Sequence, residues 1–273
     1  MSQLISRVSS ASIKIARSFV LLYVLLGLYG WFLSDSAIFF PPTSTYEKSD
    51  DILFIKNGKP NQLAAIYLKN AAAAHTILYS HGNAVDLGGL RKLMNDFYNN
   101  GYSVLAYDYS GYGLSQGTPS EQRVYQNIQT AYDYLVDEQG IKPETIIAYG
   151  HSLGGAVAAD LAYKHPVGGL VLESTFVSAF RVRTVWPLYP FDKFSTLDKL
   201  ASIEVPILVM HSMDDPVIPF WHSKSLFSAA NKPKMNYWLK NTGHGGAPHS
   251  GPVYWNILTV FARTINTPPL QTL

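Results

Sequence analysis

The sequence contains no cysteine among its 273 residues. This absence excludes a disulfide scaffold, a thiolate nucleophile and a cysteine metal site. Internal repeats and low-complexity blocks are also absent from the sequence. The length suits one large domain or two small ones.

The net charge of the chain is also small. The formal total is +2, and residues 1–40 account for it, because Arg7, Lys14 and Arg17 are opposed there only by Asp35. The rest of the chain is balanced, so it offers no net field that would gather phosphate polyanions. We therefore expect no nucleic-acid partner.

What the sequence has instead is a long apolar segment near its N-terminus. Residues 18–33 carry no charge, and the apolar stretch reaches Phe40 if Asp35 lies at an interface. These limits correspond to about 24 to 34 Å of helix, which brackets the hydrocarbon thickness of a bilayer. We predict a transmembrane anchor over residues 18–40, preceded by a segment of residues 1–17.

The same segment admits two other interpretations. A cleaved signal peptide needs small residues at its end, and Ser34-Asp35-Ser36 is a passable site. A buried core helix would carry a polar face, which residues 18–33 lack.

The charges around the segment predict its orientation. Basic residues precede it, whereas the residues that follow are mainly acidic: Asp35, Glu47, Asp50 and Asp51, with Lys48 nearby. By the positive-inside rule the N-terminus is cytoplasmic, and the body lies on the periplasmic, lumenal or extracellular side.

Beyond Pro41-Pro42, short runs rich in β-branched and aromatic residues alternate with stretches of helical period. This alternation predicts an α/β fold with a mostly parallel sheet, over residues 41–266, followed by a loose tail at 267–273. The expected strands are Ile52–Lys56, Leu63–Leu68, Thr76–Ser80, Ser103–Tyr107, Thr145–Tyr149, Gly169–Leu172, Pro206–Met210 and Asn236–Lys240.

The clearest helix lies between the fourth and fifth of these strands. Thr118, Pro119 and Glu121 predict a cap, a proline in the first turn and a capping-box acid. The apolar residues that follow fall on one helical face: Val124, Ile128, Ala131 and Leu135.

A nucleophile is indicated by residues 150–156, Gly-His-Ser-Leu-Gly-Gly-Ala, which stand between a predicted strand and a helical pattern. This is G-x-S-x-G in the strand-to-helix context of a nucleophile elbow. The glycines permit a tight turn that holds Ser152 in a strained conformation at a helix N-terminus. The plain alternative is an ordinary capping serine.

Serine needs a base, and the chain has eight histidines. In this architecture the base follows the last strand. His244 lies in the glycine-rich loop directly after that strand and is the first candidate, and His249 is the second.

The acid is expected after the strand Pro206–Met210, where Asp214 and Asp215 are adjacent. Asp215 is favoured because the Pro-Val-Ile-Pro run after it should fix its loop. Asp214 and Glu173 are the alternatives. The acid would hold the tautomer of His244 and stabilise the imidazolium.

The loop of residues 81–86 follows an early strand and can aim a backbone N–H at the reaction centre. We predict an oxyanion hole formed by the N–H groups of Asn83 and Leu153. Asp86 and Asp108 are expected to buttress loops beside the site.

Three histidines that follow strands raise the possibility of a metal site: His81, His151 and His211. No HxH or HExxH spacing occurs in the sequence, so we expect no metal and no cofactor.

Together these pieces resemble the membrane-anchored serine hydrolases with an α/β-hydrolase domain, a family that includes protein depalmitoylases and lysophospholipid or monoacylglycerol lipases. The resemblance runs from about residue 39 to about residue 265. It rests on residues 81–84, 108–115, 117–121, 150–155, 173–176, 215, 217–219 and 243–244. It implies the α/β-hydrolase fold, a triad of Ser152, Asp215 and His244, and an oxyanion loop at Asn83.

Two positions depart from the family pattern. Ser212 stands where the family usually has a glycine, and Gly245-Gly246 stands where an Asn or Asp usually follows the catalytic histidine. Because of the second departure, the family pattern does not predict which residues contact the leaving group.

The longest insertion between strands, Val177–Glu204, is aromatic. We predict a short cap over an acyl pocket. The pocket residues would be Phe176, Phe180, Trp186, Phe220 and Trp221. Packing of these aromatic residues and one or two helices onto the sheet is the alternative.

These features predict a serine hydrolase that cleaves carboxylic ester or thioester bonds of lipophilic acyl substrates, including lipids and acylated proteins. A serine peptidase, aminopeptidase-like, is the alternative, because amide and ester substrates use the same triad. A third hypothesis is an inactive membrane-anchored binding module, which the filled triad positions disfavour.

Overall fold

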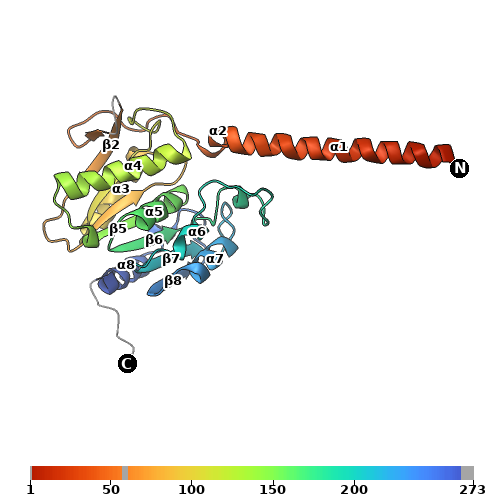
Figure 1. Cartoon of the computed structure of the whole chain (residues 1–273). Coiled ribbons are helices and arrows are strands. Elements are labelled where there is room, and N and C mark those ends of the chain that lie inside the picture. Colours follow the sequence, from red (N-terminus) through yellow and green to blue (C-terminus); the bar gives the residue numbers. More distant parts are fainter. Residues whose placement is uncertain (1, 57–60, 266–273) are drawn as a thin grey trace.

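The computed structural model describes residues 2–56 and 61–265 and contains one eight-stranded sheet (Figure 1). The strands follow the order β1-β2-β4-β3-β5-β6-β7-β8. Their bounds are β1 Leu53–Lys56, β2 Gln62–Leu68, β3 Thr76–Ser80, β4 Ser103–Tyr107, β5 Ile146–His151, β6 Gly169–Glu173, β7 Ile207–Ser212 and β8 Lys234–Leu239. β2 runs antiparallel to both neighbours, and the other pairs are parallel. The predicted α/β fold is confirmed. The predicted tail of residues 267–273 lies outside the described residues.

Helices cover both faces of the sheet. One face packs against α3 (Leu87–Asn99) and α8 (Pro252–Ile265), and the other against α4 (Glu121–Asp133), α5 (Leu153–Lys164), α6 (Leu197–Leu200) and α7 (Trp221–Ala229). Short 3-10 turns lie at Pro143–Thr145, Phe180–Val182 and Ala247–His249, and a π-helical turn lies at Tyr134–Glu138. Neighbouring strand residues such as Ile77 and Leu78 enter opposite cores, since side chains alternate along a strand.

The strand order determines where a site can form. β3, β5, β6, β7 and β8 are parallel, so their carboxyl ends meet at one edge of the sheet. β3 lies between β4 and β5, so the chain reverses its direction of growth across the sheet there. Sheets of this kind bind ligands at such a reversal, outside the carboxyl ends of the strands.

Helix α4 begins later than its sequence predicts. Ser120 is the N-cap, and its hydroxyl accepts a hydrogen bond from the N–H of Arg123 at 3.2 Å. Glu121 is therefore the first helical residue, and its carboxylate accepts the N–H of Phe194 at 2.5 Å. The prediction that Thr118 caps the helix is wrong. Glu121, the expected capping-box acid, binds the N–H of Phe194 in a distant segment. The predicted apolar face is buried as expected.

The N-terminal region forms α1 (Ser2–Phe32), which projects from the body (Figure 1), and the short α2 (Ser34–Ile38). By length and composition, residues 12–32 are a candidate membrane span. The large apolar side chains of residues 13–32 are exposed, which disagrees with a buried core helix. The helix ends before Phe40 because Phe39 is buried against Phe194 and Asp35 pairs with Lys193 at 3.4 Å.

Candidate active site

Ser152 occupies a strained turn between β5 and α5. Its backbone has φ 54° and ψ −118°, a conformation that costs about 1–3 kcal/mol and needs support from its surroundings. The N–H of Ser152 donates to the carbonyl of Glu173 at 2.8 Å. Its carbonyl accepts the hydroxyl of Thr175 at 2.6 Å. Residues of the neighbouring β6 strand end thus hold the turn.

The glycines around Ser152 are required by close approaches. A Cβ on Gly150 would lie 2.0 Å from the carbonyl oxygen of Gly154, and one on Gly154 would lie 2.0 Å from that of Ser80. A Cβ on Gly155 would lie 2.5 Å from Cβ of Thr175. The glycines of this motif are therefore required both by the turn itself, at Gly150, and by its packing against the end of β3 and the segment after β6, at Gly154 and Gly155.

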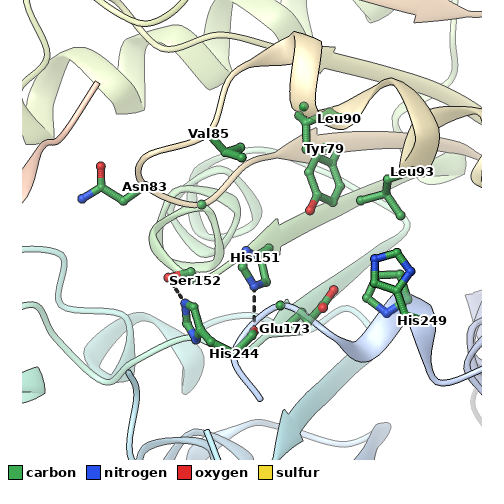
Figure 2. Close-up of a pocket in the computed structure, with 14 residues that line it drawn as sticks. Tyr79, Asn83, Val85, Leu90, Leu93, His151, Ser152, Glu173, His244 and His249 are labelled. Carbon is green, nitrogen blue, oxygen red and sulfur yellow. Dashed lines mark hydrogen bonds between the residues drawn. The ribbon is translucent and has the colours of Figure 1, made fainter. Parts of the chain in front are cut away.

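His244 connects Ser152 to a carboxylate. Its Nε2 lies 2.9 Å from Oγ of Ser152 (Figure 2), and its Nδ1 lies 2.7 Å from Oδ2 of Asp215. The structure thus brings together three residues that the sequence assigned to separate segments. His249 lines a pocket beside the site instead, and Figure 2 shows it apart from Ser152.

Asp215 is held as a carboxylate. Its Oδ1 accepts the N–H groups of Val217 and Ile218 at 2.8 and 2.9 Å. Burial raises the pKa of Asp215, but the hydrogen bonds from His244 and from these two amides outweigh burial and hold the pKa below its ordinary value. The neighbouring Asp214 accepts a hydrogen bond from Ser212 instead.

His211, near the end of β7, stabilises the loop that carries Asp215. Its Nε2 donates to the carbonyl of Ile218 at 2.9 Å, and its Nδ1 accepts the hydroxyl of Ser223 at 2.6 Å. Burial lowers the pKa of His211, so the ring stays neutral and keeps both contacts.

The predicted oxyanion loop lies directly against the nucleophile. A Cβ on Gly82 would lie 2.8 Å from Nδ1 of His151 and 3.4 Å from Cβ of Ser152. Leu153 opens α5, and the N–H groups of a first helical turn have no partner within the helix. The side chain of Asn83 accepts the Tyr112 hydroxyl at 2.5 Å.

The Asn83 side chain also binds the connection to the N-terminal helices. It accepts the N–H of Phe40 at 2.9 Å and donates to the carbonyl of Ile38. The loop beside Ser152 is therefore joined to the segment that follows α2.

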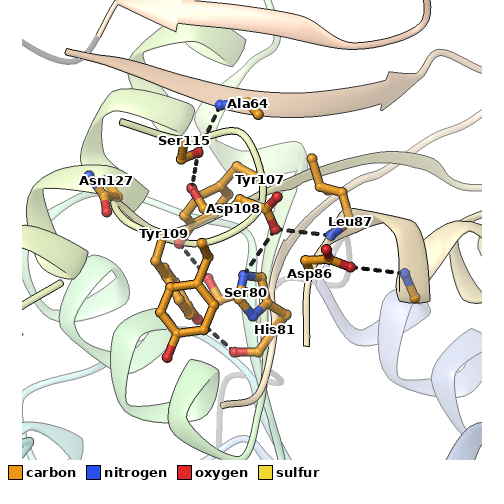
Figure 3. Close-up of polar contacts among 12 residues, drawn as sticks. Ala64, Ser80, His81, Asp86, Leu87, Tyr107, Asp108, Tyr109, Ser115 and Asn127 are labelled. Atoms are coloured by element: carbon orange, nitrogen blue, oxygen red, sulfur yellow. Dashed lines mark hydrogen bonds and ion pairs between the residues drawn. The ribbon is translucent and has the colours of Figure 1, made fainter. Parts of the chain in front are cut away.

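A second polar network lies beneath this loop (Figure 3). Asp108 accepts the hydroxyl of Tyr46 and the N–H of Leu87, and burial raises the pKa of Asp108 to about 7. His81 lies 3.5 Å from Asp108, and burial lowers the pKa of His81 to about 4. Asp86 caps α3 by accepting the N–H of Gly89 at 3.3 Å. These contacts fix loops rather than reach the nucleophile.

The strand-end histidines make separate contacts. His81 hydrogen-bonds the carbonyl of Gly82, and Nε2 of His151 donates to the carbonyl of His244 at 3.0 Å. In the described part of the chain, no group of three His, Asp or Glu side chains could hold a metal ion.

Two pockets meet at Asn83 and Ser152. The smaller, of about 250 Å³, is lined by Tyr79, Glu173 and His249 among others. The larger, of about 1010 Å³, extends between the N-terminal helices and the segment after β6. Ser152 therefore has space on two sides, with the larger pocket on the side of the N-terminal helices.

The larger pocket has only part of the predicted lining. Phe176 and Phe180 line it. Trp186 is 76% exposed, Phe220 packs on Trp238 with ring centroids 5.1 Å apart, and Trp221 stacks on His222 at 3.8 Å. These three side chains lie outside the lining of both pockets because each has another neighbour or faces outward.

Sequence reasoning missed the contribution of the N-terminal helix to this pocket. Leu26, Tyr29 and Gly30 line it. The available signal was the pair Gly27 and Gly30, since small residues in an apolar helix permit close packing.

Comparison with known proteins identifies the family. Residues 71–194 match the family described as "Serine aminopeptidase, S33". The chain is 36% identical over 197 residues to human alpha/beta hydrolase domain-containing protein 17B, an alignment that covers 69% of this chain and 67% of that protein. The chain belongs to the alpha/beta hydrolase domain-containing protein 17 family. The mouse protein 17C of this family is 34% identical over 204 residues, which cover 71% of this chain and 62% of that protein.

Solved structures share the fold of this alpha/beta hydrolase. An esterase of Pyrococcus furiosus superposes with a TM-score of 0.68 at 17% identity, covering 82% of this chain and 99% of that one. The acylaminoacyl peptidase of Pyrococcus horikoshii gives 0.62 at 16% identity, covering 78% and 40%. The chain is therefore a hydrolase of the α/β family with esterase and peptidase neighbours in fold.

Proposed function

We propose that this hydrolase cleaves carboxylic ester or thioester bonds of lipophilic acyl substrates through Ser152, His244 and Asp215. The observation that carries the proposal is the unbroken hydrogen-bond chain through these residues, with distances of 2.9 and 2.7 Å, beside a pocket of about 1010 Å³. This geometry is that of a serine nucleophile, its general base and the carboxylate that orients the base.

The reaction proceeds in two steps. Oγ of Ser152 attacks the acyl carbon while its proton passes to Nε2 of His244. The N–H groups of Asn83 and Leu153 stabilise the oxyanion, each by about 2.7–4 kcal/mol. Collapse expels the alcohol or thiol, which takes the proton from His244. Water then attacks the acyl-enzyme, gives a proton to His244 and releases the acid, and Ser152 recovers its proton.

The apolar pocket favours an acyl group over a peptide. Phe176, Phe180 and Leu153 line it, and the transfer of a lipophilic acyl chain from water to such a surface is favourable.

A labelling experiment tests the nucleophile. We expect a fluorophosphonate probe to label the wild-type chain and to leave Ser152→Ala unlabelled. Labelling that persists in Ser152→Ala would refute the proposal.

The match to a serine aminopeptidase family keeps a peptidase as the second candidate function. Paired assays on p-nitrophenyl acyl esters and on aminoacyl anilides separate the two. We expect faster hydrolysis of the acyl esters, and faster hydrolysis of the anilides would make the peptidase the better assignment. Hydrolysis of neither substrate by a folded chain would favour an inactive binding module.

The N-terminal helix supports a membrane location. We propose that α1, which ends at Phe32 rather than at the predicted residue 40, is a retained anchor with its N-terminal side in the cytoplasm and the hydrolase domain, residues 41–266, on the outer face. Residues 12–32 are long and apolar enough for such a span, and the flanking charges favour this orientation. A reporter fused to the C-terminus that is active only in the cytoplasm would contradict the orientation.

A further inference from the structure

The N-terminal helix packs against the segment that follows β6. Tyr23 of α1 stacks on Tyr189 with ring centroids 4.6 Å apart, and Trp31 meets Phe191 edge to face at 4.9 Å. A Cβ on Gly27 would lie 2.8 Å from the ring of Tyr189. The contact thus follows α1 over about two turns.

The larger pocket runs between these two elements and ends at the nucleophile. Its lining includes residues of α1, of the segment after β6 and of the nucleophile elbow: Leu26, Tyr29, Gly30, Phe180, Leu188 and Ser152. α2 adds Ala37 and Ile38 to the same lining. One groove therefore joins the apolar helix to the reactive hydroxyl.

The position of the contact along α1 determines how deep in the bilayer the groove would lie. Tyr23 lies nine residues before Phe32, the last residue of α1, which corresponds to about 14 Å of helix. One leaflet contributes about half of the ~30 Å hydrocarbon core. With α1 spanning the bilayer and Phe32 near an interface, residues that contact Tyr23 lie within one leaflet.

The segment beside Tyr23 is suited to that environment. Val185, Trp186 and Leu188 are 57%, 76% and 58% exposed, and contiguous exposed apolar side chains mark a membrane or partner contact. The carbonyl of Val185 accepts Nη2 of Arg181 at 2.8 Å, and that of Leu188 accepts the hydroxyl of Tyr23 at 2.8 Å. These carbonyls are satisfied without water, as a lipid environment requires.

We propose that α1 is one wall of the acyl-binding groove and that the groove opens into one leaflet. The substrate is then a long-chain acyl ester or thioester held in the same membrane, whose acyl chain slides from the bilayer along Tyr29 and Gly30 toward Ser152. This inference rests on the proposed function, since it requires an acyl-transferring Ser152 and a membrane-spanning α1.

A substitution in the groove tests the proposal. The full chain is reconstituted in phosphatidylcholine vesicles, and kcat/KM is measured for a soluble butyryl ester and for a palmitoyl ester in the bilayer. Gly30→Leu places a branched side chain where ring atoms of Phe180 lie 3.4 Å from the Cβ position. We expect the palmitoyl-to-butyryl ratio to fall about 50-fold, the effect of excluding about three methylene groups.

Leu25→Phe is the matched control. It adds bulk to the same helix at an exposed residue outside the pocket lining, and we expect the ratio to stay at the wild-type value. A ratio for Gly30→Leu within twofold of wild type overturns the proposal.

Two palmitoyl substrates distinguish the carrier of the acyl chain. One arm uses monopalmitoyl glycerol and the other an S-palmitoylated peptide, both in vesicles. The carrier is the one whose palmitoyl substrate the wild-type chain hydrolyses with the higher kcat/KM, and the Gly30→Leu defect is expected with that substrate. Failure of the proposed function gives a different result, because the wild-type chain then hydrolyses neither the butyryl nor the palmitoyl esters. That result would also overturn the inference about the groove.

A crosslink tests the packing without activity. The chain has no cysteine, so Gly27→Cys with Tyr189→Cys introduces the only two thiols. We expect a short bifunctional thiol reagent to join them in vesicles and to leave Leu25→Cys with Tyr189→Cys unjoined. Equal crosslinking of the two pairs, or none in the first, overturns the proposal.

Discussion

Replacing Asp215 with asparagine exchanges an oxygen for an NH₂ group, and the way the carboxylate is held determines the effect. Oδ1 accepts the amides of Val217 and Ile218 at 2.8 and 2.9 Å, so the asparagine oxygen keeps that place. The NH₂ group then replaces Oδ2, which lies 2.7 Å from Nδ1 of His244. An NH₂ group donates, so Nδ1 must accept and the ring proton moves to Nε2. In that tautomer His244 cannot take the proton of Ser152.

We expect Asp215→Asn to lower kcat about 10⁴-fold, or about 5.4 kcal/mol of transition-state stabilisation. The two amide contacts persist, so the thermal midpoint should change little. The assay is p-nitrophenyl butyrate hydrolysis by the full chain, with thermal unfolding of each variant measured in parallel.

The adjacent carboxylate provides the matched control. Asp214 bonds Ser212 rather than His244, so Asp214→Asn should stay within about twofold of wild type. The reasoning is refuted if Asp215→Asn keeps a tenth or more of wild-type kcat, or if both variants lose activity equally.

Three further predictions concern other parts of the site. Gly154→Ala places Cβ 2.0 Å from the carbonyl oxygen of Ser80 at the end of β3 and should cost about 3 kcal/mol or more by thermal unfolding, whereas Gly245→Ala, with nothing within 4 Å, should be near neutral. The folded pKa of Asp108, about 7, lies above its ordinary 3.8, so wild-type stability is lost as pH rises between these values. Asp108→Asn should therefore gain stability relative to wild type by about 1.4 kcal/mol per pH unit in that window, and a pH-independent difference in urea unfolding would contradict this. His249→Ala should retain activity within about threefold in the ester assay, since that side chain is outside the Ser152–His244 contact, and a hundredfold loss would assign it a larger role.

The features that the sequence predicts well are local ones. The strands follow from short apolar runs, and the turn at Ser152 follows from the G-x-S-x-G motif, in which Gly150 and Gly154 approach each other across the turn. The features that it misses depend on distant segments. Glu121 bonds Phe194, 73 residues away, which shifts the start of α4. Tyr23 bonds the carbonyl of Leu188 across 165 residues.

The aromatic residues of the 177–204 insertion illustrate the same limit. Composition marks the insertion as apolar, but it does not say which ring faces the site. Phe180 lines the larger pocket because the N-terminal helix lies opposite it, whereas Trp186 faces outward. No periodicity distinguishes these two positions, since the segment is mostly irregular.

The hydrogen bonds between Asn83 and residues 38–40 have a consequence for shedding of the body by proteolysis. A protease that cut after Asp35 or Ser36 would place Ile38 and Phe40 close to the new N-terminus and would separate Asp35 from Lys193. The loop that carries Asn83 would then lose the hydrogen bonds that join it to residues 38–40. With α1 as the proposed anchor, a single cut is expected both to release the body from the membrane and to lower the activity of Ser152.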